Sequence, residues 1–182
     1  MNNNYCLDLK FDFLPLRKDF DPFSIPIGHT KLDEQYISEE FFQCIESLNL
    51  RLLYMEVFVK GPNYGPGVHV DHGKLDMAKL NWVYGGKDST MCWYKQKLGI
   101  KHIPKFNVTP IKSQSIIYDI ENVDLVHEQS IGFPSLIQSG VPHGIYTKDE
   151  TRHCYSAVLF TKDWKRLKFS EMAELFKDYH LQ

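Results

Sequence analysis

The stretch Gly-Pro-Gly-Val-His-Val-Asp-His-Gly, residues 65–73, is the part of the chain around which the rest can be interpreted. Its glycines and proline predict a loop that leads into an extended segment. On a strand, side chains two residues apart share a face, so His69 and Asp71 point to one side and Val68 and Val70 to the other. The pair could therefore hold a metal ion together with a third ligand from elsewhere.

A candidate for that third ligand is His143, in the stretch Val-Pro-His-Gly, residues 141–144. Pro142 restricts the backbone before it, and Gly144 leaves room for a ligand after it. The alternative is an ordinary turn histidine. Two histidines and one carboxylate on one side of an ion leave open positions, as in non-haem Fe(II) oxygenases. His72 follows Asp71 directly, so on a regular strand it points away from the ion.

Hydrophobic patterning predicts short strands that follow one another at turn spacing, which is typical of an antiparallel sandwich or barrel. The predicted strands span residues 5–14, 52–60, 78–84, 90–95, 114–119, 133–138 and 151–161. Within 52–60 the alternation places Leu53, Met55, Val57 and Val59 on one face. Helical spacing predicts one helix with Ser38 as its N-cap and a closing helix from Ser170 onward.

Length and composition indicate a single globular domain over residues 1–182, with 43% hydrophobic, 24% charged and 14% aromatic residues. A formal net charge of -2 argues against a nucleic-acid partner. No apolar run approaches the roughly 20 residues that span a bilayer, so we expect no membrane partner and a soluble, cytoplasmic protein. The four cysteines form no CxxC pair and are expected to be reduced and buried.

The predicted strand 151–161 carries a charge among small and apolar residues. On one of its faces lie Arg152, Cys154, Ser156 and Val158. An arginine that points inward requires an anion, and a dicarboxylate would satisfy its guanidinium through two hydrogen bonds. The alternative is an edge-strand arginine that extends into solvent.

The ordered set His69-x-Asp71, His143 and Arg152 resembles the Fe(II)/2-oxoglutarate-dependent dioxygenases, whose motif is HxD…H followed by an arginine about ten residues on. The neighbourhood of residues 79–83 looks like that of small bacterial or phage members, and the similarity covers roughly residues 69–160. The resemblance implies a mainly β fold: a double-stranded β-helix, or cupin-like jelly roll, with flanking α-helices. One departure is Cys154, which stands where many members have Ser or Thr; Ser156 follows on the same face.

The same resemblance implies an enzyme with Fe(II) and 2-oxoglutarate as cofactors. His69, Asp71 and His143 would hold the metal, and Arg152 would pair with the far carboxylate of 2-oxoglutarate. The expected reaction consumes O2, releases succinate and CO2, and hydroxylates an amino-acid residue of a peptide or a small metabolite.

Further residues are candidates for contact with the cosubstrate or the substrate. Asn81 and Trp93 lie on strands after the HxD motif and could face the cosubstrate; equally, Asn81 could lie at a strand edge and Trp93 in the core. Ser156 could bind the cosubstrate carboxylate. Tyr64 and Lys74 lie in connections that should flank the mouth of the site.

Three other functions are compatible with the same residues. A cupin-type metalloprotein would use the barrel and metal triad without 2-oxoglutarate, and would give Arg152 no special role. In a non-enzymatic β-sandwich binding or virion protein the histidines would be incidental. A hydrolytic zinc site is less favoured, because no HExxH motif is present.

Overall fold

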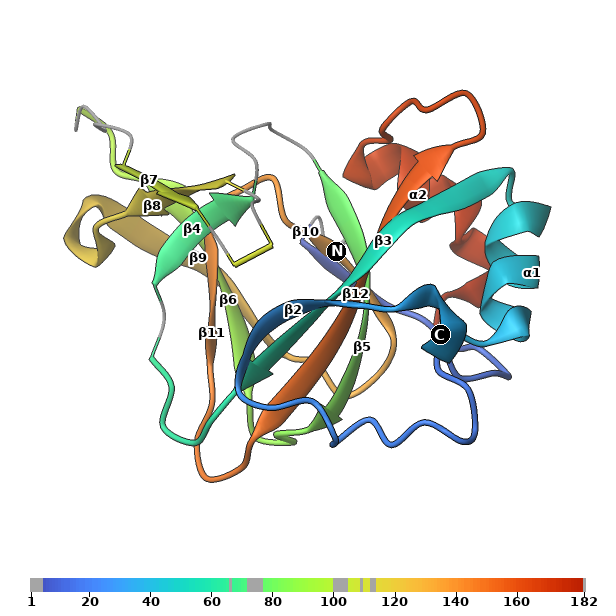
Figure 1. Cartoon of the computed structure of the whole chain (residues 1–182). Coiled ribbons are helices and arrows are strands. Elements are labelled where there is room, and N and C mark those ends of the chain that lie inside the picture. The colour runs from blue at the N-terminus through green and yellow to red at the C-terminus, as the bar shows by residue number, and fades with distance from the viewer. Residues whose placement is uncertain are drawn as a thin grey trace.

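The computed structural model of the chain describes residues 5–65, 67–71, 77–99, 105–108, 110–111 and 114–181. Within them, two six-stranded sheets face each other, and every strand pairing is antiparallel (Figure 1). The first sheet has the order β1 (Cys6–Asp8), β10 (Ser135–Gln138), β5 (Ala78–Gly85), β12 (Arg152–Thr161), β3 (Leu50–Lys60), β2 (Gly28–Leu32). The second has the order β7 (Lys105–Val108), β8 (Gln114–Tyr118), β4 (Val68–Asp71), β11 (His143–Tyr146), β6 (Thr90–Gln96), β9 (Val123–Ser130). The predicted antiparallel β class is confirmed as a β-sandwich.

Two α-helices lie beside the first sheet, on the right in Figure 1. Helix α1 (Glu39–Ser47) begins as predicted, because the Ser38 hydroxyl accepts a hydrogen bond of 3.2 Å from the Phe41 amide. Helix α2 (Phe169–Leu175) is the closing helix. Short 3-10 turns span Glu34–Tyr36, Ile120–Asn122 and Lys177–Tyr179.

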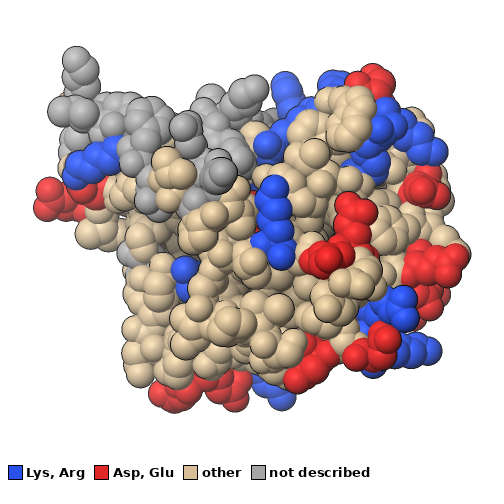
Figure 2. All heavy atoms as spheres, in the orientation of Figure 1, with Lys and Arg blue, Asp and Glu red and all other residues tan. Residues whose placement is uncertain are grey.

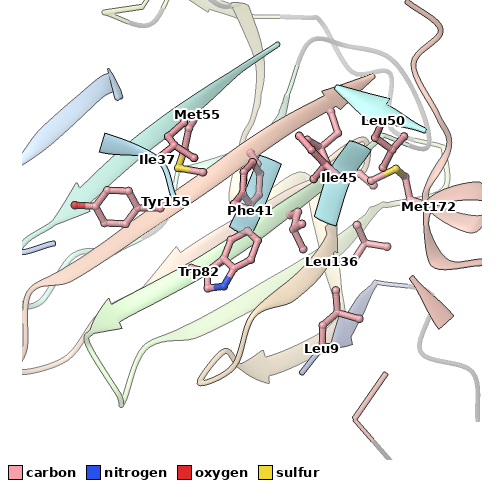
Figure 3. Packing of buried hydrophobic residues seen from close by; sticks show 14 of the residues in the cluster. Leu9, Ile37, Phe41, Ile45, Leu50, Met55, Trp82, Leu136, Tyr155 and Met172 are labelled. Atoms are coloured by element: carbon pink, nitrogen blue, oxygen red, sulfur yellow. The ribbon is translucent and has the colours of Figure 1, made fainter. Parts of the chain in front are cut away.

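The largest hydrophobic core lies between the first sheet and the two helices rather than between the sheets (Figure 3). Phe41 from α1, Leu80 and Trp82 from β5, and Tyr155 from β12 meet there, each at most 3% exposed. Strands β3, β5 and β12 therefore each turn one row of apolar side chains toward the helices.

Two strand predictions were wrong in detail. Leu53 is 39% exposed, because the register between β12 and β3 shifts between Val158 and Leu159; the irregularity leaves Leu53 unpaired and out of phase with its neighbours. The strand predicted over residues 5–14 is reduced to β1. Beyond it the apolar Phe11 packs on Trp82, with ring centroids 5.4 Å apart, instead of continuing a sheet.

The face of the first sheet that is turned toward the second sheet carries buried polar residues. Glu56 from β3, Lys79 and Asn81 from β5, and Ser156 from β12 are each at most 3% exposed. Beside them a small apolar cluster contains Met91, Trp93 and Ile137, and Ile137 pairs directly with Lys79. The sandwich therefore encloses a polar cavity beside a short apolar filling.

The surface and the cysteines agree with the composition. On the face in Figure 2, positive and negative side chains are interspersed around a broad uncharged area. All four cysteines are free and buried, as predicted. Among the residues that the structure describes, no helix is long and apolar enough to cross a membrane.

Candidate metal centre

His69, Asp71 and His143 converge on one point between the sheets. His69 and Asp71 lie two apart on β4, and His143 begins β11, the neighbouring antiparallel strand, directly opposite His69. One ligand atom from each residue lies within 4.8 Å of the others, and the two imidazole centroids are 4.5 Å apart. His69 and Asp71 therefore share a face of β4, as predicted, and His143 lies beside them.

Each imidazole is oriented by a backbone carbonyl two residues earlier in the chain. Nδ1 of His69 lies 2.9 Å from the Gly67 carbonyl oxygen, and Nδ1 of His143 lies 2.8 Å from that of Val141. A carbonyl oxygen accepts a hydrogen bond, so Nδ1–H is the donor in each ring, and in the neutral imidazole Nε2 carries the lone pair. This is how a second partner fixes the tautomer of a metal-binding histidine.

The protonation states of His143 and Asp71 suit a cation. Burial, together with the neighbouring His69 ring, lowers the pKa of His143 to about 4, so this imidazole is neutral at pH 7. Burial by itself would raise the pKa of Asp71. The Lys79 ammonium and the two imidazoles outweigh that effect and hold this pKa well below its usual range, so the carboxylate stays ionised.

A buried ion chain, which the sequence analysis missed, supports the triad from the first sheet. Lys79 Nζ lies 2.7 Å from Asp71 Oδ2 and 2.6 Å from Glu56 Oε2. Burial favours the neutral amine, but the two carboxylates hold the pKa of Lys79 above its usual range. Beyond Glu56, the His29 ring approaches its other oxygen at 3.9 Å.

The triad opens into a cavity of about 390 Å³ between the sheets, within the size range of small-molecule sites. Arg152 lines this cavity and is 3% exposed. Its Nε has no hydrogen-bond partner, and within the described residues no carboxylate forms an ion pair with it. Lys60, directly opposite Arg152 on β3, also lines the cavity. The predicted inward arginine is thus a buried cation without an anion.

The other predicted cosubstrate residues are divided between cavity and core. Asn81 and Ser156 line the cavity, and the Ser156 hydroxyl donates a hydrogen bond of 2.6 Å to Asn81 Oδ1. Because the Ser156 hydroxyl donates its hydrogen bond to Asn81 Oδ1, the amide Nδ2 of Asn81 is the donor that remains for a bound anion. Cys154 also lines the cavity, and burial raises the pKa of its thiol.

Trp93 is a core residue: it does not line the cavity, and its indole donates to the Gln138 carbonyl at 3.0 Å. Tyr64 does line the cavity, as predicted for the loop before β4. The interpretations of His72 and Lys74 fall outside the described residues.

The alternation of side chains along β3 and β5 could have indicated the cavity residues that were not predicted. Glu56 and Lys60 are out of phase with the buried apolar residues of β3, and Lys79 is out of phase with Leu80 and Trp82. Such polar positions are usually assigned to solvent.

Comparison of the chain with protein-family models, with curated proteins and with solved structures gave no match.

Proposed function

We propose that the protein is an Fe(II)- and 2-oxoglutarate-dependent dioxygenase that hydroxylates an amino-acid residue of a peptide or a small metabolite. The observation that carries this proposal is the coincidence of two features in one cavity. A two-histidine, one-carboxylate cluster lies on the second sheet, and a buried arginine that forms no ion pair with a carboxylate of the described residues lines the cavity from the first.

Strand order supports a double-stranded β-helix as the finer description of the sandwich. Successive strands β3, β4, β5 and β6 alternate between the two sheets, and β9, β10, β11 and β12 alternate again. As a result β12 lies between β3 and β5, and β11 lies between β4 and β6. This interleaving of early and late strands is what a jelly roll requires, and it brings His143 beside His69.

The donor set fits Fe(II). Two imidazoles and one ionised carboxylate, all from the second sheet, match the facial triad of non-haem iron oxygenases. When bound, Fe(II) would mediate the reaction of O2 with 2-oxoglutarate and a substrate C–H bond, which give up two electrons each, so that one oxygen atom enters succinate as CO2 is released and the other enters the hydroxylated product. The chain's own part is to hold the ligands in place and to surround the reacting groups with β-sheet walls.

Arg152 and Asn81 fit the cosubstrate. A carboxylate at Arg152 would satisfy a buried guanidinium, and charge-assisted hydrogen bonds of this kind are among the stronger ones in proteins. Asn81, held by Ser156, would donate from Nδ2 to the same anion. Lys60, across from Arg152, adds positive charge to this wall of the cavity.

The test is an anaerobic Fe(II) titration with and without 2-oxoglutarate, followed by the metal-to-ligand charge-transfer band in the visible. We expect the band only when both are present, and we expect its loss in His143→Gln. His153→Gln is the matched control, because His153 is also buried on a sandwich strand but hydrogen-bonds to Ile25 outside the cavity. If wild-type protein bound Fe(II) and gave no band with 2-oxoglutarate, a cupin-type metalloprotein would replace the dioxygenase.

A further inference from the structure

The buried ion chain determines which oxygen of Asp71 can reach a metal. Oδ2 of Asp71 is engaged by Lys79 at 2.7 Å, whereas Oδ1 is the oxygen turned toward Nε2 of His69, at 3.6 Å. Nε2 is also the coordinating nitrogen of that ring, since Nδ1 is engaged by the Gly67 carbonyl. A cation bound between His69 and Asp71 therefore meets one carboxylate oxygen, and the other is occupied by an ammonium group.

Lys79 is itself held in place. Its side chain is 3% exposed, and its ammonium donates a second hydrogen bond, of 2.6 Å, to Glu56, which is 1% exposed and lies on β3, on the far side of β12 from Lys79. An ammonium has three donors and is held less rigidly by one partner than by two. With a carboxylate on each side, Nζ is held between Asp71 and Glu56 of its own sheet, so its position does not depend on Asp71 alone.

We propose that Lys79 is a positioning residue that keeps Asp71 a single-oxygen metal ligand, and that Glu56 anchors Lys79 for this role. This inference rests on the proposed function, because only that function requires open positions at the metal. A facial triad is useful because it leaves positions open for small molecules, and an aspartate bound through both oxygens would close one that the cosubstrate or O2 needs.

The experiment uses Co(II) as the probe, bound to the full chain without 2-oxoglutarate. Infrared difference spectra report the separation between the asymmetric and symmetric carboxylate stretches, which narrows when a carboxylate binds a metal through both oxygens. The key variant is the double substitution Lys79→Met with Glu56→Gln, which removes one positive and one negative charge together. It avoids the single buried charge that Lys79→Met alone would leave on Glu56.

For wild type we expect the wide separation of a single-oxygen ligand. In the double variant we expect a narrow separation of the two stretches. We also expect Co(II) to bind about 10- to 100-fold more weakly, the usual cost of removing an outer partner of a metal ligand. The matched control is Lys177→Met with Glu174→Gln, the same substitutions at an exposed ion pair of 2.7 Å, and it should leave both readouts at the wild-type value.

Each outcome decides the matter. A narrow separation in wild type overturns the inference even if the double variant fails to fold, and so does a wide separation that persists in a folded double variant. Absence of Co(II) binding to wild type also overturns it, and Lys79 would then simply be the counterion of Asp71. If 2-oxoglutarate gives the charge-transfer band but the double substitution leaves the carboxylate separation unchanged, the role of Lys79 is refuted and the proposed function stands. If the double substitution narrows the separation but 2-oxoglutarate gives no band, only the proposed function is refuted.

Discussion

Replacing Arg152 by methionine should have opposite effects on ligand binding and on stability. Arg152 is 3% exposed, and its Nε has no hydrogen-bond partner in the described part of the chain. In the ligand-free protein it is therefore a buried charge whose desolvation is not repaid by an ion pair. Exchanging such a group for an apolar side chain of similar shape is often neutral or stabilising, by roughly 1 to 4 kcal/mol.

For 2-oxoglutarate the same substitution removes the proposed partner of a carboxylate. Truncating one member of a buried, hydrogen-bonded charge pair costs about 2 to 5 kcal/mol, which corresponds to roughly 30-fold to several thousand-fold in Kd. The proposed metal ligands lie on the opposite sheet, so the Kd for Fe(II) should change by less than about threefold, under 1 kcal/mol. Stability and affinity should thus move in different directions.

The assay combines anaerobic calorimetric titration of 2-oxoglutarate into the Fe(II) protein with thermal melts of the ligand-free protein. Arg51→Met is the matched control: Arg51 lies on the adjacent strand β3, packs on the Trp164 ring at 4.4 Å and does not line the cavity. A lower melting temperature for Arg152→Met, together with parallel losses in metal and 2-oxoglutarate affinity, would refute the reasoning and make Arg152 a structural residue.

Two further predictions concern the support of this site. Gly86→Ala should weaken 2-oxoglutarate binding and lower stability by about 1 kcal/mol or more, measured by titration and melting, because φ is +55° and a Cβ would lie 2.7 Å from Arg152 Cβ; unchanged values would contradict this close contact. The folded-state pKa of His143, about 4, lies below the ordinary histidine value of 6.5. The unfolded chain therefore binds more protons, and about 3 kcal/mol of stability should be lost as pH falls from about 6.5 to about 4. Denaturant unfolding of metal-free protein across this window should show a smaller pH slope in His143→Gln than in wild type, and equal slopes would exclude this linkage.

Local patterns predicted much of the fold, because their physical causes act within a few residues. The Ser38 hydroxyl caps α1 since an N-cap needs only its own next turn. Strand alternation put His69 and Asp71 on one face because side chains on any strand alternate. The same rule failed at Leu53, where an irregularity opposite Val158 changes the phase, and such an irregularity depends on the partner strand.

The sequence by itself determined the chemical types of the site: two histidines, one carboxylate and an arginine in a fixed order, on segments that favour strands. Only the tertiary structure decided which polar residues face each other. Glu56 and Lys79 alternate with apolar neighbours as solvent-facing residues do, and they are buried because a second sheet covers that face. Alternation distinguishes two faces of a strand, but what packs on each face depends on segments far away in the chain. For that reason the ion chain behind Asp71 emerges only once β4 lies over β3 and β5.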